Sequence, residues 1–337
     1  MSRGDVRTFA FLTIALLLAG CADSGGSEGD DADLADDAGA SAPRGSGAPS
    51  SGASGDSGAT DADPARWYAF AFSREVEPKS GGSGRIQSYS YTTTKENDGA
   101  ETTVDVVVTV EGVSTENVRT QKMDMASGNY EPVVVSTPLE VTKLRHEMTV
   151  VKDDAGDREA GETSVVTIWI PTGELPESST FVWYFVKMAW EGEGGERGGW
   201  EYYVSPQMQA EQEQGGVIYL PFEDGRSGGS WWAFDLMTSM YGLSWFAPYV
   251  TGEQAFEEGS FSYGGYSQSV RRETFRIGGY AFDGWSVQLS GVSGGSSSGW
   301  MMKASEDLPI PVAFRFGSSG DGSSSVISYE LTDLRLG

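Results

Sequence analysis

The sequence contains a single cysteine, Cys21, and a single histidine, His146, among 337 residues. A lone cysteine cannot form an intramolecular disulfide, so the fold must be held together by packing. One histidine without a free thiol leaves no histidine-rich metal site, no cysteine nucleophile and little basis for a Ser-His-Asp triad. We therefore expect no metal, no cofactor and no catalytic residues.

Basic residues are also scarce. The chain has 23 lysines and arginines, only seven of them lysines, against 49 acidic residues, which gives a net charge of −26. No basic stripe exists that could release phosphate counterions, so the composition argues against nucleic acid as a partner. Abundant carboxylates with few lysines suit solubility in strong salt, where self-repulsion is screened, and a halophilic host is one interpretation.

Long apolar runs are absent. The apolar run near the N-terminus, residues 9–19, is uncharged, has eleven residues and follows Arg3 and Arg7. As a helix it would be roughly 16 Å long, whereas the hydrocarbon core of a bilayer is about 30 Å thick. A basic start, a short apolar stretch and small residues at its end are typical of an export signal rather than of a membrane span.

The tetrad at the end of this stretch, Leu18-Ala19-Gly20-Cys21, resembles a prokaryotic lipobox. That resemblance implies that residues 1–20 are a lipoprotein signal peptide, cut between Gly20 and Cys21. The Cys21 thiol would then carry a diacylglyceryl group that anchors the mature protein, outside the cytoplasm, to a membrane. Two acyl chains satisfy the requirement for durable attachment, since one chain alone binds membranes only marginally.

A polar segment separates Cys21 from the rest of the chain. Residues 22–64 are mostly Gly, Ser, Ala and Asp, contain no aromatic residue, and carry ten acids against Arg44 alone. Such a segment cannot bury enough apolar surface to offset its loss of conformational entropy. We expect residues 21–64 to be a lipidated, disordered acidic tether, followed by a single β-rich domain over residues 65–337.

Alternation of apolar and polar residues dominates from residue 66 onward. Val104, Val106, Val108 and Val110 share one face of a predicted strand. Leu144, His146, Met148 and Val150 do so in another. Further strands are predicted at 67–73, 85–93, 163–170, 180–190, 200–204, 217–222, 261–266, 270–282, 285–289, 310–316 and 325–336.

Many short strands without a long helical period predict a mainly β protein. We expect a large antiparallel curved sheet or half-open β-barrel, with a β-sandwich as the alternative.

One segment breaks this alternation. Residues 231–241 follow Ser230, a possible N-cap, precede Gly242, and are apolar on almost every side. We expect a buried apolar helix on the concave side of the sheet. It is either plain core or a lid over an apolar ligand, and the lid residues would be Trp231, Trp232, Phe234, Leu236, Met237 and Met240.

The C-terminal part carries a second resemblance. Gly299–Ser305, Asp307–Val312 and Tyr329–Leu336 contain a Trp strand, a Leu-Pro-x-Pro turn and an alternating last strand. Together they resemble the final hairpin of lipoprotein-carrier-like proteins, which fold as half-open β-barrels and in some cases hold lipid. The resemblance implies such a half-barrel and, for some members, an apolar or lipid ligand. Residues 199–205 weakly echo 299–305, which could reflect duplication or chance.

Two functions from different classes follow. The first is a non-catalytic, membrane-anchored lipoprotein that holds an apolar or lipid ligand in the curved sheet. The second is an adhesion or glycan-binding sandwich that presents some of the 10 Trp and 14 Tyr on an exposed face. His146 shares its face with apolar residues, which favours a hydrogen-bonded histidine in the core or at its rim. An enzyme with a glycosidase-type carboxylate pair stays open, because sequence spacing does not reveal the separation of two acids.

Overall fold

All residues that the computed structural model describes belong to one compact unit, Ala62–Gly337. The described residues are 72, 74–135, 138–156, 158–172, 185–192, 195, 197–225, 257–263, 265–293, 296–320 and 322–337.

Most described residues lie in one large sheet. Its strands are β1 (Ile86–Asn97), β2 (Ala100–Glu116), β5 (Leu139–Asp153), β6 (Thr163–Pro171), β7 (Lys187–Gly192), β8 (Arg197–Glu201), β10 (Phe222–Gly225), β11 (Gly259–Tyr263), β12 (Tyr266–Ile277), β13 (Tyr280–Ser293), β14 (Ser296–Ser305), β15 (Leu308–Gly320) and β16 (Ser323–Leu336). The order of these 13 strands in space is β10-β8-β7-β6-β5-β2-β1-β16-β15-β14-β13-β12-β11.

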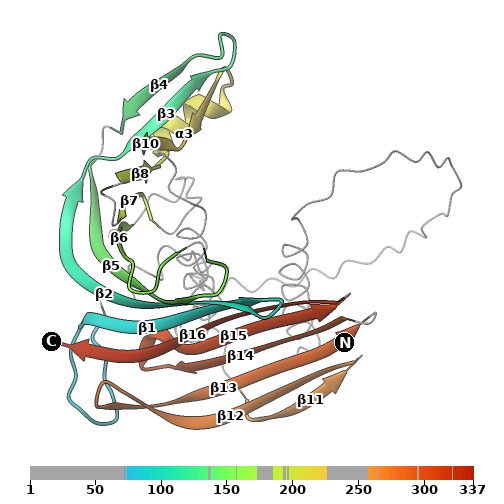
Figure 1. Ribbon diagram of the computed structural model, residues 1–337. Helices are drawn as coiled ribbons and strands as arrows, with labels where there is room; N and C mark the ends of the chain where they lie inside the picture. Colours follow the sequence, from blue (N-terminus) through green and yellow to red (C-terminus); the bar gives the residue numbers. More distant parts are fainter. Residues whose placement is uncertain are drawn as a thin grey trace, which may run out of the picture. The chain divides into compact units, whose positions relative to one another are not determined.

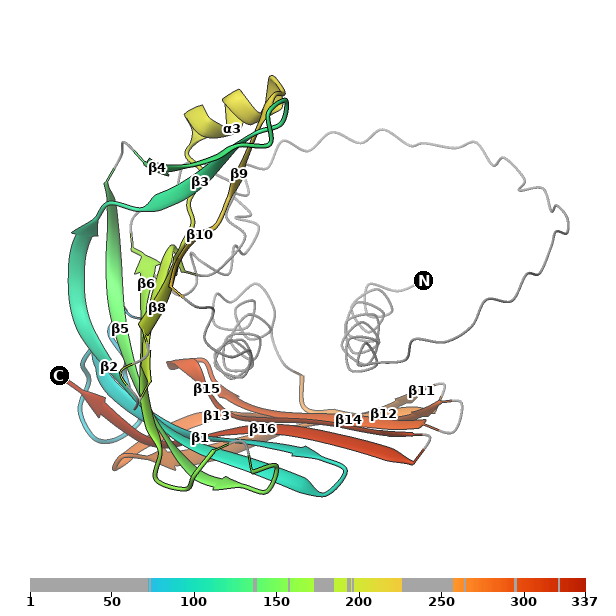
Figure 2. The same ribbon diagram turned by 45° about the horizontal axis from the view of Figure 1, so that its top comes forward.

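Every pair of neighbouring strands in this sheet is antiparallel, and the first and last strands, β1 and β16, lie side by side in its middle. The two edge strands, β10 and β11, do not pair with each other, so the sheet is open rather than a closed barrel. Figures 1 and 2 show how strongly it curves between the β11–β16 part and the β5–β10 part. The predicted mainly β fold with one large, curved antiparallel sheet is confirmed.

Over much of its width the sheet has one apolar face, as the alternation predicted, although Phe275 and Phe282 are buried on the other side of β12 and β13. Val104, Val106 and Val108 of β2 are buried, and in β5 the residues at 144, 146, 148 and 150 are buried as well. Val106 lies opposite Met148 on one side and Tyr91 of β1 on the other, so the apolar residues of three strands share one face. We call it the apolar face.

A smaller sheet with one helix lies next to the β8–β10 end of the large sheet. β3 (Arg119–Asp124) pairs with β4 (Tyr130–Val134) and β9 (Val217–Leu220). The helix α3 (Pro206–Glu213) begins after Ser205, whose hydroxyl accepts a hydrogen bond from the Met208 amide. A separate core joins this region to β5 and β6, and it includes Val118, Leu139, Trp169, Tyr203 and Tyr219.

The sequence analysis did not predict β3, β4 or α3. Only Met208 of α3 is buried, so the helix lacks the apolar stripe that marks an amphipathic helix. Its start nevertheless carries a local signal, because Ser205 and Pro206 occupy the cap and first positions that these residues favour.

The prediction of one strand over 270–282 is wrong. Gly278 and Gly279 both have positive φ, 55° and 85°, and form a two-residue turn between β12 and β13. A hairpin turn with positive φ at both central residues matches the twist of its strands and favours glycine. The strand predicted at 200–204 is displaced too, because β8 ends at Glu201. Most of 67–73, the first part of 180–190 and the whole of 231–241 lie outside the described residues.

Candidate functional site

The residues singled out from the sequence as sites fall outside the described part of the chain. These are Cys21 with Leu18, Ala19 and Gly20 of the lipobox, and Trp231, Trp232, Phe234, Leu236, Met237 and Met240 of the expected helix. Both groups stay predictions. No helix among the described residues is long and apolar enough to cross a bilayer.

The middle of the apolar face carries a cluster of aromatic rings. The ring centroids of Tyr91 and Tyr329 are 4.6 Å apart, and Tyr329 stacks on Phe314 at 5.5 Å. Tyr89 stacks on Tyr91 at 6.2 Å, so the rings bridge β1, β16 and β15. Burial raises the pKa of Tyr89 and Tyr329, because a phenolate would lose its hydration there. These tyrosines therefore act as neutral parts of an apolar surface.

Next to this cluster, three apolar side chains form a row across neighbouring strands. Trp300 of β14 lies opposite Phe316 of β15, and Phe316 lies opposite Ile327 of β16. All three are partly rather than fully buried. We call them the apolar strip. It continues into a buried cluster of Val270, Trp285 and Val287, against which Trp300 packs.

His146 lies on the apolar face of β5, between Val108 and Val166 of the adjacent strands, and is 3% exposed. Its Nδ1 atom makes no hydrogen bond with the described residues. Burial lowers its pKa to about 4, against smaller opposing effects of the Val166 and Leu144 backbones. The ring is therefore neutral at pH 7, and the predicted core position is confirmed.

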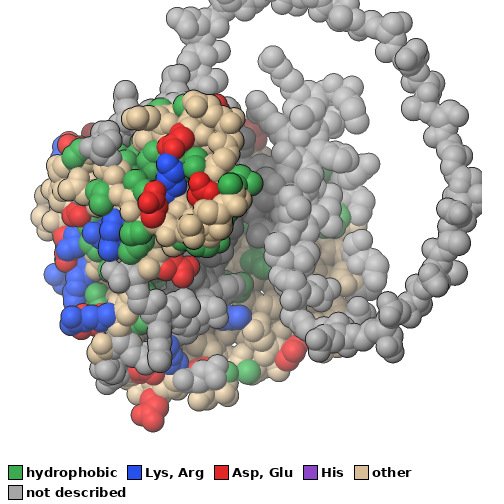
Figure 3. Space-filling view, turned by 90° about the horizontal axis from the view of Figure 1, so that it is seen from above, with side chains coloured by type: hydrophobic (Ala, Val, Ile, Leu, Met, Phe, Trp, Pro, Cys, Tyr) green, Lys and Arg blue, Asp and Glu red, His purple; other side chains and the backbone are tan. Residues whose placement is uncertain are grey.

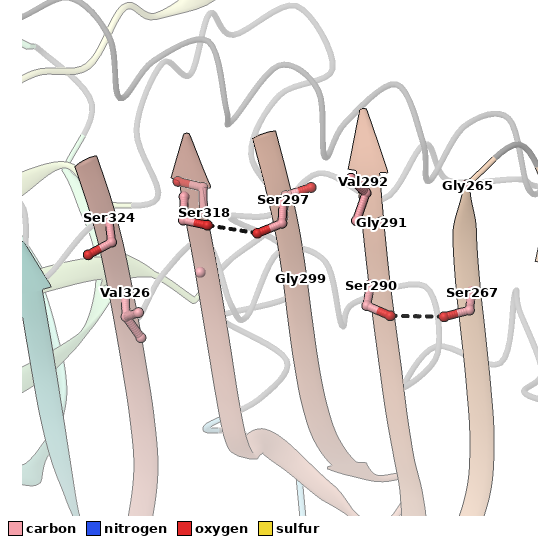
Figure 4. A pocket seen from close by; sticks show the side chains of 13 residues that line it. Gly265, Ser267, Ser290, Gly291, Val292, Ser297, Gly299, Ser318, Ser324 and Val326 are labelled. Carbon is pink, nitrogen blue, oxygen red and sulfur yellow. Dashed lines mark hydrogen bonds between the residues drawn. The ribbon is translucent and has the colours of Figure 1, made fainter. Parts of the chain in front are cut away.

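At the end of the sheet that holds the β11–β12 turn, the opposite face of β12–β16 is polar and exposed, and it carries a shallow hollow of about 550 Å³ (Figure 4). Serines and glycines line most of it, and two serine pairs hydrogen-bond across strands. Ser267 and Ser290 are 2.9 Å apart, and Ser297 and Ser319 are 2.7 Å apart. We call this surface the serine face. Among the described residues that line it, none is charged or aromatic; besides hydroxyl and backbone groups, the hollow offers a ligand the side chains of Val292 and Val326.

Charged side chains are mostly engaged with one another. Glu201 is almost fully buried and accepts hydrogen bonds from the Arg119 amide at 2.7 Å and from its Nε and a terminal nitrogen at 3.0 and 2.7 Å. The Glu211 carboxylate of α3 accepts from Lys122 and from the Tyr219 hydroxyl, both at 2.5 Å. Both clusters tie the small sheet in place: Glu201 holds the start of β3, and Glu211 joins α3 to β3 and β9.

These contacts lower the pKa of the Glu211 carboxyl and raise that of Lys122, so both stay charged. In the view of Figure 3, acidic and basic side chains lie interspersed. Within the described ranges, no three His, Cys, Asp or Glu side chains come together in a way that could hold a metal ion.

Neither the apolar strip nor the role of Glu201 was predicted from the sequence. Trp300 and the 310–316 alternation were noted singly, but their side-by-side placement depends on the registers of β14, β15 and β16. Glu201 gave no local signal, since its partner Arg119 lies 82 residues away.

Comparison of the chain with known proteins finds no matching family model, no matching curated protein and no matching solved structure.

Proposed function

We propose that the chain is an extracytoplasmic, non-catalytic lipoprotein, anchored through Cys21, whose large sheet holds an apolar or lipid ligand against the apolar strip. The observation that carries this proposal is the one-sided sheet, whose apolar face runs continuously across the strands from β6 to β12. On this face the strip of Trp300, Phe316 and Ile327 keeps apolar surface partly accessible.

Burying apolar surface provides the affinity for such a ligand. Removing about 150 Å² of apolar area from water stabilises a complex by about 4 kcal/mol, before the entropy lost on binding is subtracted. An alkyl chain lying across three strands covers that much area. It needs no hydrogen-bond partner from the strip.

The alternative, a glycan-binding module, requires exposed aromatic rings on which sugars can stack. In the described part of the chain, the large apolar side chains that are exposed include just two aromatic ones, Tyr130 and Phe261, on the separate strands β4 and β11. The hollow of the serine face has hydroxyl groups but no stacking platform. These observations favour the apolar ligand over the glycan.

The apolar strip can be tested by inserting a charge. We expect Phe316→Asp to weaken binding of a fluorescent fatty acid by at least about tenfold, because a carboxylate would have to be desolvated under the alkyl chain. Ser319→Asp introduces the same charge on the same strand but on the serine face, and should leave affinity unchanged. Fluorescence titration measures the affinity of each variant, and circular dichroism checks that both variants are folded like the wild type. Equal affinity of both variants would remove the strip from the proposal.

The anchor can be tested separately. We expect Cys21→Ser to move the protein from the membrane fraction to the soluble fraction and to abolish incorporation of a labelled fatty acid. The reason is that no other cysteine in the chain can accept a thioether-linked lipid. Immunoblotting of fractionated cells measures the distribution. If the Cys21→Ser protein stays with the membranes, attachment has another cause.

A further inference from the structure

The two edges of the large sheet are built differently. The edge strand β10 carries the exposed Glu223, and such a charge discourages pairing with another strand. The other edge strand, β11, reads Gly-Ser-Phe-Ser-Tyr and has no charge and no proline. Its pairing with β12 runs without a bulge from Gly259 to Tyr263. Within the strand itself, β11 therefore has none of the charge, proline or bulge that protect an edge.

The side chains of β11 continue both faces of the sheet. Ser260 and Ser262 lie opposite Ser269 and Ser267 of β12, so they belong to the serine face. Phe261 lies opposite Gln268, which in turn pairs with the buried Leu289, so it belongs to the apolar face. Phe261 is 50% exposed, and Gly259 to Ser262 are exposed. The edge is accessible and keeps the two-faced character of the sheet.

We propose that β11 is a self-association edge, at which a second copy of this chain adds its own β11 in the antiparallel direction, centred on Phe261. In that register Phe261 faces the partner's Phe261, and Ser260 faces the partner's Ser262. The arrangement has two-fold symmetry, the commonest symmetry of protein dimers. It joins the two sheets into one and saturates the backbone groups of both edges.

A second copy fits this edge because the strand is complementary to itself. Cross-strand serine pairs already occur twice on the serine face, Ser267 with Ser290 and Ser297 with Ser319. Pairing of β11 with its copy repeats this contact twice more. On the apolar face the two Phe261 rings meet, and aromatic cross-strand pairs stabilise sheets.

The distribution of charge also favours β11 as the contact between two copies. A chain of net charge −26 repels its copy over most surfaces, but β11 has no charge to repel. Glu257 and Glu258 precede the strand, and in this register they fall opposite positions 265 and 264 of the partner, both glycines, rather than opposite another acid. The contact is short, well below the area of about 1,200–2,000 Å² that stable interfaces bury, so we expect a weak dimer in solution.

Sedimentation velocity tests the proposal with the full chain carrying Cys21→Ser, so that acyl chains cannot cause association. Over a hundredfold concentration range around 10 µM, on the order expected for a weak contact, we expect a reversible monomer–dimer equilibrium. Phe261→Lys should shift that equilibrium at least about tenfold toward the monomer, because lysine on an edge strand opposes pairing. Val292→Lys, at another exposed apolar residue of the same end of the sheet, should leave it unchanged.

Disulfide trapping tests the register, and does not require the lysine variant to fold. In the Cys21→Ser background, Phe261→Cys gives each chain a single thiol. Directly opposed residues in antiparallel strands have Cα atoms about 4.5–5.5 Å apart, within the range that a disulfide spans. We expect Phe261→Cys, and not Val292→Cys, to form a covalent dimer on mild oxidation. A protein that stays monomeric throughout, a dimer unaffected by Phe261→Lys, or equal trapping at both positions would overturn the proposal.

Discussion

Replacing Glu201 by alanine should lower the free energy of unfolding by about 3 kcal/mol. The Glu201 side chain is 5% exposed and accepts three hydrogen bonds from Arg119, while the Lys187 ammonium lies 3.9 Å away. Removing the carboxylate takes away these three hydrogen bonds and leaves the Arg119 and Lys187 cations without the anion between them. Because Arg119 begins β3 and stacks on Phe222 of β10, the loss should loosen the connection of the small sheet to the large one.

Urea unfolding, followed by tryptophan fluorescence, measures this effect. Glu191→Ala is the matched control, since Glu191 pairs with Arg197 on the surface, where both side chains are more than half exposed. Exposed ion pairs contribute about 0–1 kcal/mol to the free energy of unfolding. A loss at Glu201 no larger than the loss at Glu191 would mean that the buried pair does not hold the two sheets together.

Acidification from pH 7 to pH 5 should destabilise the protein through His146 by about 2 kcal/mol. The pKa of His146 is lowered to about 4 in the folded protein, against 6.5 in an exposed histidine. Above pH 6.5 the ring is neutral in both states, so its full contribution to stability is present. As the pH falls from 6.5 toward 4, the unfolded chain takes up a proton that the folded chain refuses, and stability is lost.

Two variants separate this titration from packing. His146→Leu and His146→Gln change the shape and polarity of the site in different ways, but neither titrates. Between pH 7 and pH 5, the free energy of unfolding of both variants should therefore fall by about 2 kcal/mol less than that of the wild type, the amount set by the pKa difference. The difference between wild type and variant is the quantity to plot, because carboxylates titrate alike in all three proteins. If wild type and variants have parallel stability curves over this interval, His146 is not buried and neutral.

Local alternation predicted the strands well because it depends only on which face of a strand is buried. The runs at Val104–Val110 and Leu144–Val150 are apolar at every second residue, and both lie in strands with the predicted face buried. The hairpin at Gly278–Gly279 was missed because strand-like residues continue on both sides of it. The helix α3 was missed because it buries a single side chain and thus leaves no helical period.

Features that depend on contacts between distant parts of the chain could not be predicted from the sequence. The pairing of β1 with β16 joins segments more than 200 residues apart, and no local pattern encodes it. The apolar strip and the two-faced edge at β11 exist only once the registers of several strands are known. The lipobox differs from these, because its signal is contained in four adjacent residues and its interpretation needs no fold.

Native mass spectrometry of the full Cys21→Ser chain, purified from its producing cells without detergent, tests the central proposal most directly. The account predicts a population whose mass exceeds that of the polypeptide by one lipid, which is released on collisional activation. It also predicts that this population is reduced in Phe316→Asp and retained in Ser319→Asp. A bare polypeptide mass in every charge state, unchanged after incubation with fatty acid or phospholipid, would contradict a lipid-holding role for the sheet.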